Sequence, residues 1–373
     1  MYDTTTGKVL YDLELAAEPE WSEKINDPGG WKITVPLDGG PRTVRVREWC
    51  VRWRFSVAVL RGGQVCQAGP IVAYTPDTST PTMTLSGKGV WELLNRRLLH
   101  NAIYNPAAGG RLTDASADIN LTDTLPDIAR EIVNHAINMS FLLGSNLPID
   151  LPALDPTQGT NVRNYHGYDM VTFGQRLQEL TQVDGGPDVL FRPYLTVTGG
   201  ARYIRHEMKV GKPYLVQPGV PMLFDYPSNL TDITLSGDGS NDANSAYVKG
   251  TGNESGSLYG YASDTSLVSL GWPLMDMVDS GHTSTPVQST LDSWAVADVA
   301  LYSNQPEQWQ TTVLADTEPR LGSYSSGHYV NYAVKGHLWI KDGIYSWRLI
   351  GMSRTSSTPR DRVDHQIQAV RQS

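Results

Sequence analysis

The chain has 373 residues, of which 18% are charged, and its formal net charge is -9. A nucleic-acid binder usually carries clustered Lys and Arg, so an acidic chain without a basic run argues against that class. The opening segment MYDTTTGKVLYDLELAAEPEW lacks the basic and apolar regions of a signal peptide. No stretch approaches the roughly 18 apolar residues of a membrane-spanning helix. We therefore expect a protein that is made in the cytoplasm and does not cross a membrane.

Composition favours a mainly β protein of more than one domain. At roughly 150 residues per domain, the length suggests two or three domains, or one domain interrupted by another. The 35 Gly and 23 Pro residues are enough to break the chain into many short elements. Tyr and Trp number 18 and 10 against only 5 Phe, and these amphipathic rings suit either a β-rich core or intersubunit surfaces.

Residues 1–88 are predicted to be all β, with short strands separated by DPGG, LDGG and RGG turns. The segment from Trp49 to Val59 alternates like one strand, with Cys50 on the face opposite Trp49. A two-residue turn at Gly62-Gly63 would then pair Cys66 with Val59 and place it on the face opposite Cys50. We therefore predict two free thiols, which fit a reducing cytoplasm.

Residues 89–304 are predicted to be an inserted α+β region. GVWELLNRRLLH has helical spacing, and Thr124 is placed to cap a helix in TLPDIAREIVNHAI, with Asp127 in its first turn. That helix has one apolar stripe, formed by Leu125, Ile128, Ala129, Ile132, Val133, Ala136 and Ile137. A second helix is predicted over about 167–183, ended by Gly185-Gly186-Pro187. Its apolar face is expected to hold Met170, Phe173, Gly174, Leu177 and Leu180.

The later segments return to strands. The segment DVLFRPYLTVTGGARYIRHEM predicts a hairpin around Gly199-Gly200, with Arg192 on the strand face opposite that of Phe191. Loops and strand ends dominate residues 226–290, and a weaker helix is predicted over 291–302. Residues 305–373 are predicted to be β, with an Asp342-Gly343 turn between two strands. A last strand is expected in RVDHQIQAV, where Val363, Ile367 and Ala369 share one face.

No residue is predicted to be catalytic, to bind a cofactor or to bind a metal. The eight histidines are scattered without a ligand spacing, at positions 100, 135, 166, 206, 282, 328, 337 and 365. A segment with Asp238, Ser240, Asp242 and Asn244 at alternate positions faintly resembles a calcium loop. It has Ala243 where that loop needs Gly, and Lys249 where it needs Glu. A polar turn is the preferred interpretation.

Motifs for nucleophilic or nucleotide chemistry are absent from the sequence, which has neither G-x-S-x-G nor G-x-x-x-x-G-K-[ST]. Carboxylate pairs such as Glu18 with Glu20, or Asp361 with Asp364, could serve glycoside hydrolysis only at a set separation across a sugar cleft. We interpret them as solvated surface acids.

The order of segments resembles one protein family across nearly the whole chain. TTTGKVLYDLELAAEPEWSEKINDPGGWKITVPL is followed by GKGVWELLNRRLL, LPDIAREIV, YDMVTFGQRLQELTQVDGGPDVLFRPYL and DGIYSWRLIGMSRT. This series resembles the minor tail proteins of long-tailed phages, in particular the baseplate hub or tail-tip proteins of actinobacteriophages. The resemblance implies two β-barrel-like hub domains drawn from residues 1–88 and 305–373, with α+β material at 89–304 between them.

The resemblance also implies a structural role in the virion, at the distal tip of a non-contractile tail. The expected assembly is a homotrimer beneath the distal tail protein, in contact with the tape-measure protein and with other minor tail proteins, and any contact with the host envelope is expected to be indirect. Some members of the family carry a cell-wall-degrading domain after the hub, and we expect none here.

Two alternatives from other classes stay open. The Trp and Tyr content would suit a carbohydrate-binding β protein, because these rings can stack on sugars. A cell-wall hydrolase is the enzyme hypothesis, for which the sequence offers no catalytic constellation.

Overall fold

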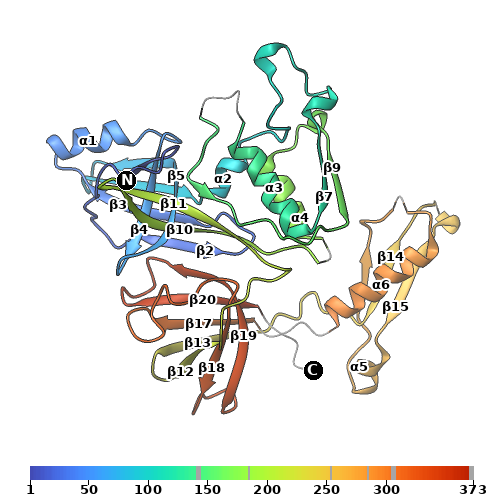
Figure 1. Ribbon diagram of the computed structural model, residues 1–373. Helices are drawn as coiled ribbons and strands as arrows, with labels where there is room; N and C mark the ends of the chain where they lie inside the picture. Colours follow the sequence, from blue (N-terminus) through green and yellow to red (C-terminus); the bar gives the residue numbers. More distant parts are fainter. Residues whose placement is uncertain (140–143, 184, 253, 284, 304–307, 369–373) are drawn as a thin grey trace. The chain divides into compact units, whose positions relative to one another are not determined.

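The computed structural model describes residues 1–139, 144–183, 185–252, 254–283, 285–303 and 308–368 (Figure 1). These residues fall into two units. The first comprises Met1–Ile233 and Gln310–Gln368, and the second covers Thr234–Trp309. The finer division predicted at residues 88/89 and 304/305 stays a prediction.

The first part of the chain forms six strands and one helix. The strands are β1 (Tyr2–Asp3), β2 (Glu20–Lys24), β3 (Gly30–Pro36), β4 (Phe55–Arg61), β5 (Gln64–Asp77) and β6 (Thr82–Lys88). They lie in the order β1-β4-β5-β6-β3-β2 within one sheet. Apolar residues alternate inward along them, as in β3, where Trp31, Ile33 and Val35 are buried.

Helix α1 (Pro41–Trp49) and the loop after it correct the prediction of an all-β opening. The segment from Trp49 to Arg54 was predicted as strand, but β4 begins only at Phe55. Pro41 stands in the first turn, and the Asp38 carboxylate accepts hydrogen bonds from the N–H groups of Gly40 and Thr43 at 2.9 and 3.3 Å. These contacts hold the helix start.

Cys66 also departs from its predicted register. Gly62 and Gly63 both have positive φ and form the predicted two-residue turn, with Arg61 opposite Gln64. A β-bulge then places Val59 opposite Gln67, so Cys66 has no partner residue. Both cysteines are free and buried, and burial raises the pKa of the Cys50 thiol to about 11 and that of Cys66 to about 12.

Six later strands extend the same sheet. They are β12 (Met222–Tyr226), β13 (Leu230–Ser236), β17 (Gln308–Leu314), β18 (Tyr329–Val334), β19 (Gly343–Arg354) and β20 (Arg362–Gln368). Strand β19 pairs with β2, β18 and β20, and the order continues from β20 to β17 and β13. Val363 and Ile367 share the buried face of β20 as predicted, whereas Ala369 lies outside the described residues.

The prediction of a mainly β fold is confirmed, with 38% of the residues in strands and 19% in helices. Barrel closure is not observed. Within the described ranges no sheet closes into a barrel, and the strands from the two ends of the chain instead share one 12-stranded sheet.

The prediction of a strand immediately before Asp342-Gly343 is wrong. Residues 337–341 form a loop, and the strand that precedes this loop and pairs with β19 is β18, which ends at Val334 opposite Gly343. The His337 Nδ1 atom accepts hydrogen bonds from the N–H groups of Trp339 and Ile340. A strand would need those N–H groups for its ladder.

The α+β part of the first unit has its own core. Its helices are α2 (Trp91–Leu94), α3 (Leu125–Ile137) and α4 (Phe173–Thr181), with 3-10 turns at Pro106–Ala108, Ala115–Ala117 and Gly167–Asp169. Its strands are β7 (Ile119–Asp123), β8 (Ile149–Asp150), β9 (Asn161–Tyr165), β10 (Val189–Thr198) and β11 (Ala201–Val210). Helices α3 and α4 pack on each other near α2 (Figure 1).

Both predicted helices are confirmed, the second with a shorter range. The Thr124 hydroxyl accepts a hydrogen bond from the Asp127 N–H at 3.2 Å, and every residue of the predicted α3 stripe is buried. Helix α4 starts only after Thr172, which caps it. Met170 therefore precedes the helix, with φ of 53° and 63% exposure, and its predicted place on the buried face is wrong.

The β10–β11 hairpin turns at Gly199-Gly200 as predicted and joins the N-terminal strands. The Ile204 N–H donates to the Gly7 carbonyl at 2.8 Å, and the Val9 N–H donates to the Arg202 carbonyl at 2.9 Å. The hairpin thus links the α+β core to the beginning of the chain.

The second unit packs one helix on a small sheet. Its elements are β14 (Ser245–Lys249), β15 (Tyr259–Ser263), β16 (Asp276–Asp279), α5 (Thr265–Ser269), α6 (Gln288–Tyr302) and a 3-10 turn at Glu254–Gly256. Val248, Leu291 and Ala295 form its core. The weak helix predicted over 291–302 is confirmed as α6. Among the described residues, no helix has the length and apolar character needed to span a membrane.

Candidate functional site

Strands from the two ends of the chain meet where β2 pairs with β19, and we call this pairing the β2–β19 seam. Lys24 lies opposite Gly351 and Trp21 lies opposite Arg354 in an antiparallel ladder. Arg354 is buried and donates a hydrogen bond to the Pro19 carbonyl at 2.7 Å. The seam therefore fixes the early strands against a strand near the other end of the chain.

A buried carboxylate lies at this seam. Glu23 is 7% exposed and shares the buried face of β2 with Trp21. Its Oε1 atom accepts a hydrogen bond from the Ser326 N–H at 3.2 Å. Burial raises the pKa of Glu23, and this rise is partly opposed by hydrogen bonding from Ser326 and then by the charges of Arg192 and Lys209. Arg192 itself donates to the Gly322 carbonyl at 3.0 Å, which gives it a structural partner.

A buried ion pair connects the α+β part to β19. The Arg348 guanidinium contacts the Asp188 carboxylate, and both side chains are 6% exposed. Asp188 also accepts a hydrogen bond from the Leu215 N–H at 2.8 Å, and the Tyr214 ring lies 4.8 Å from the guanidinium carbon of Arg348. These extra contacts offset part of the cost of removing two charges from water.

His365 belongs to the core of the C-terminal strands. Its Nδ1 atom lies 2.9 Å from the Tyr332 hydroxyl, and its Nε2 atom lies 3.0 Å from the Tyr324 hydroxyl. Burial lowers the pKa of His365 to about 3. Both ring nitrogens are used in these contacts, so the side chain is built into the packing of the sheet.

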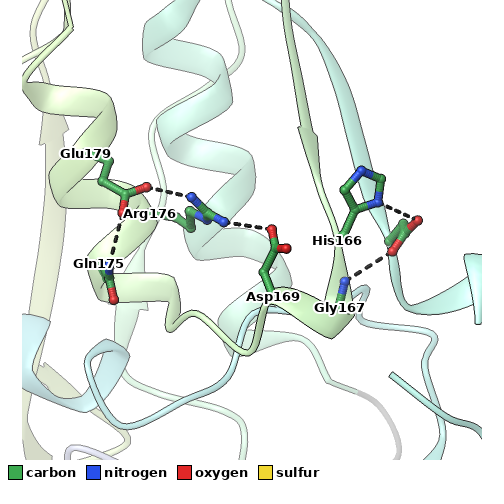
Figure 2. Close-up of polar contacts among 7 residues, drawn as sticks. His166, Gly167, Asp169, Gln175, Arg176 and Glu179 are labelled. Atoms are coloured by element: carbon green, nitrogen blue, oxygen red, sulfur yellow. Dashed lines mark hydrogen bonds and ion pairs between the residues drawn. The ribbon is translucent and has the colours of Figure 1, made fainter. Parts of the chain in front are cut away.

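The exposed polar cluster in Figure 2 lies around the start of α4. His166 Nδ1 is 2.9 Å from Asp118, whose other oxygen accepts the Gly167 N–H at 3.1 Å. Arg176 bridges Asp169 and Glu179, each at 2.8 Å. The hydrogen bond with His166 lowers the pKa of Asp118.

This His and Asp arrangement orients an imidazole as in acid-base sites, but nucleophilic catalysis also needs a hydroxyl or thiol at the second ring nitrogen. In the part of the chain that the structure describes, none is paired with Nε2 of His166. The neighbouring Tyr168 ring stacks on His166 at a centroid distance of 4.8 Å and is 52% exposed. The cluster thus presents an aromatic surface next to ion pairs.

The acidic residues singled out in the sequence have local partners. Glu18 pairs with Arg360 at 2.9 Å, Glu20 pairs with Lys32 at 3.0 Å, and Asp364 accepts a hydrogen bond from Thr312 at 2.8 Å. The Asp361 carbonyl accepts the Ala315 N–H at 2.8 Å. These contacts assign Glu18, Glu20 and Asp364 to the packing of the sheet strands and their connections.

The calcium-loop-like segment is organised by hydrogen bonds instead. Asp238 accepts the Ser240 N–H at 2.9 Å, and the buried Asn244 amide bonds to Pro273 and Met275. Across the described ranges, no group of three or more His, Cys, Asp or Glu side chains is placed to hold a metal ion.

Sequence reasoning missed Glu23 and the Asp188–Arg348 pair. For Glu23 a signal was present, because it stands between Trp21 and Ile25 at the spacing of one strand face. For Asp188 and Arg348 there was none, since 160 residues separate them.

Comparison with known proteins shows a shared fold over almost the whole chain, without a match in sequence. No family model matches the chain, and no curated protein matches it in sequence. Among solved structures, the 43 kDa tail protein of prophage MuSo2 from Shewanella oneidensis aligns with a TM-score of 0.53 and 13% identity, over 95% of this chain and 94% of that one. The chain therefore shares the fold of that tail protein over almost its whole length.

Two further tail proteins align at lower scores. The tail protein from Neisseria meningitidis MC58 has a TM-score of 0.49 and 13% identity, over 94% of this chain and 91% of that one. Prophage tail protein gp18 from Listeria monocytogenes EGD-e has a TM-score of 0.43 and 9% identity, over 95% of this chain and 89% of that one.

Proposed function

We propose that the chain is a structural virion protein of the phage tail tip, where it forms a trimeric baseplate hub. The observation that carries this proposal is the shared fold with the MuSo2 tail protein across 95% of the chain. The β2–β19 seam supports it, because it makes one sheet from both ends of the chain and so gives each copy a broad β surface for a ring.

The finer assignment rests on the sequence resemblance. In it, the hub belongs to a long non-contractile tail and lies beneath the distal tail protein, with the tape-measure protein and other minor tail proteins as neighbours. Each of these proteins would contact a surface of the hub ring. Mass spectrometry of purified virions, with antibody labelling under the electron microscope, tests this assignment. Labelling at the distal tail end supports it, and absence of the chain from virions contradicts it.

We propose further that this chain has no enzymatic activity of its own. Among the described residues, two His–Asp pairs come nearest to an acid-base site. The His166 ring contacts Asp118 and the Tyr168 ring, and the His282 ring contacts Asp279 and the Trp294 ring. Incubation with purified host cell wall tests the proposal. Release of soluble fragments by this chain alone would contradict it.

A second candidate function is sugar binding at the surface of the α+β part. The half-exposed Tyr168 ring, held by its stack on His166, is the observation that favours it, since aromatic faces stack on sugar rings. Sedimentation with purified cell-wall glycans tests it. Binding that Tyr168→Ala abolishes, while Tyr74→Ala leaves it intact, would support this function; Tyr74 is exposed to a similar extent, at 46%.

A further inference from the structure

Charge is distributed very unevenly between the two units. Residues 234–309, which cover the second unit, contain nine Asp or Glu residues and a single Lys or Arg, which is Lys249. Their net charge is therefore -8, out of -9 for the whole chain. A surface field of one sign attracts an oppositely charged partner, so the second unit is suited to a basic partner.

The open face of the sheet in the second unit carries a group of aromatic rings. Helix α6 covers the other face, where Val248 is buried (Figure 1). On the open face, Tyr247 lies opposite Tyr261 on β15 and opposite Val278 on β16. The Tyr247 ring centroid lies 4.9 Å from that of Tyr261 and 6.1 Å from that of Tyr259. The three tyrosines therefore form one continuous aromatic surface.

This surface is exposed and carries free acids at both ends. Tyr259, Tyr261 and Val278 are 58%, 47% and 69% exposed. Asp276 starts β16 on the same face, and Glu254 lies in the connection between β14 and β15; both are exposed. In the part of the second unit that the structure describes, neither carboxylate pairs with a cation, and the ion pair found there joins His282 to Asp279. We call this surface the tyrosine face.

A basic surface of the first unit has complementary properties. Residues 42–54 contain five Arg and one Glu. The exposed ones, on α1 and in the turn after it, are Arg45, Arg47, Arg52 and Arg54. None of these four forms an ion pair within the described ranges, and the guanidinium groups of Arg45 and Arg54 lie over the rings of Tyr11 and Phe55. We call these four residues, with the half-exposed Val44 and Val51 between them, the arginine patch.

We propose that the arginine patch of one copy binds the tyrosine face of a second copy. Guanidinium groups stack on exposed tyrosine rings and pair with carboxylates such as Glu254 and Asp276. Val44 and Val51 add apolar area opposite Val278. Each copy carries both surfaces, so donor and acceptor are present in equal numbers. Their unpaired charges have opposite sign, which makes a second copy the complementary occupant.

Lys249 is the group on the tyrosine face that opposes the contact. It is exposed and lies opposite Tyr259 on the neighbouring strand, so its charge repels an approaching arginine. Replacing it with an acid is therefore expected to tighten the association, whereas most substitutions at an interface weaken it.

The contact joins two different surfaces of identical chains, so it is head to tail and closes into a ring when the rotation between copies allows it. It goes beyond the proposed function and does not rest on it, because the two surfaces are complementary wherever the chain is located.

Charge reversal in the full chain tests the contact. The patch variant carries Arg45→Glu and Arg47→Glu, and the face variant carries Glu254→Lys and Asp276→Lys. All four side chains are exposed, and circular dichroism checks folding. Should either variant misfold, Arg45→Gln with Arg47→Gln replaces the first, and Asp276→Asn replaces the second. The control, Arg111→Glu with Arg320→Glu, changes the net charge as the patch variant does, at two exposed arginines outside the patch.

Sedimentation velocity at protein concentrations up to about 1 mM, which detects even millimolar contacts, measures the association. We expect the wild type and the control to self-associate, less so as salt is added, and each reversal variant to lose at least about tenfold in affinity. Mixed in equal amounts, the two variants should associate more tightly than either alone, because the reversed charges then face each other.

The aromatic part of the contact is tested by Tyr261→Ala, which should weaken the association by about threefold or more. Tyr74→Ala should leave it unchanged, since Tyr74 is exposed to a similar extent, at 46%, and lies outside both surfaces. Lys249→Glu should strengthen it by about threefold.

The proposal is overturned if the wild type stays monomeric, if the patch variant associates like its control, or if mixing the two variants restores nothing. A monomeric wild type that sediments with cell-wall glycans through Tyr261 would assign the tyrosine face to sugar instead. Detection of the chain in virions is a separate result. If the chain is in virions but the variants do not complement, only the contact is wrong, and the reverse outcome removes only the proposed function.

Discussion

The carboxylate of Glu23 accepts a hydrogen bond from the backbone N–H of Ser326 at 3.2 Å, across 303 positions of sequence. This contact reinforces the β2–β19 seam, at which the early and late strands of the chain become one sheet. The stability of the first unit should therefore respond to the ionisation of this one buried group.

Glu23→Gln is expected to make the protein less sensitive to rising pH. Burial raises the pKa of Glu23 above its ordinary value of 4.5, so the stability linked to its protonated form is present at low pH and is lost as pH rises through the raised pKa. Gln keeps the acceptor for Ser326 without the charge. Each unit of pKa difference corresponds to about 1.4 kcal/mol. Urea unfolding should show Glu23→Gln gaining stability relative to the wild type as the pH rises above the ordinary pKa of 4.5. A difference in free energy of unfolding between the two proteins that stays constant with pH would contradict this expectation.

His365→Gln is expected to weaken the acid sensitivity of the fold. Burial lowers the pKa of His365 from 6.5 to about 3. The unfolded chain therefore takes up a proton that the folded chain does not, and stability is lost as pH falls from 6.5 toward 3. One such histidine contributes a slope of about 1.4 kcal/mol per pH unit. Burial also lowers the pKa of His206 to about 3. Urea unfolding over this pH range should therefore show that replacing both residues removes twice the pH dependence of the free energy of unfolding that replacing His365 removes. If the free energy of unfolding of the variant depended on pH as in the wild type, the two imidazoles would be accessible to water in the folded protein.

Arg348→Met should destabilise the protein by about 3–5 kcal/mol, because it leaves the buried Asp188 carboxylate without its cation. Arg320→Met is the control, since Arg320 pairs with Glu318 on the surface, with 69% and 76% of their side chains exposed. Exposed pairs contribute at most about 1 kcal/mol. Chemical denaturation of both variants checks the contrast, and equal losses would mean that the Asp188–Arg348 pair is hydrated.

Ile132→Asp should abolish soluble folding, because it places an unpaired charge in the core formed by α2, α3 and α4. Ile103→Asp is the matched control, since Ile103 belongs to the same part of the chain but is 67% exposed. Soluble yield and circular dichroism compare the two. An Ile132→Asp variant that melts like the wild type would refute the stripe assignment for α3.

Local signals explain which elements were predictable. Helix α3 combines a Thr124 cap with an apolar stripe, and both act within a few residues. Helix α1 was missed because Val44 and Val46 alternate as in a strand, while its start is held by Asp38, which lies before the helix. The alternation of polar and apolar residues in 337–341 also predicted a strand. These residues form a loop, because the His337 ring accepts a backbone N–H there.

The candidate site could be predicted less well than the helices, because it depends on pairing between distant strands. The alternation of β2 and β19 shows that each is half buried, but it does not show that Trp21 lies opposite Arg354. An apolar pocket of about 390 Å³ is likewise lined by residues of β3, β4, the β10–β11 hairpin and the segment after β1, which meet only in the folded chain. Sequence order alone supported the resemblance to tail-tip proteins, whereas the MuSo2 tail protein shares the fold of this chain.

The most direct test of the account is the copy number and position of this chain in intact tails, measured by electron cryomicroscopy. The resemblance implies that tail tubes of this class have sixfold rings, and a hub whose two chain ends each supply β structure could match that symmetry with three copies. The account predicts three copies at the distal tail end, with the strands of residues 1–88 and 305–368 in one ring. Six copies per tail, or the two sets of strands in separate layers, would contradict it.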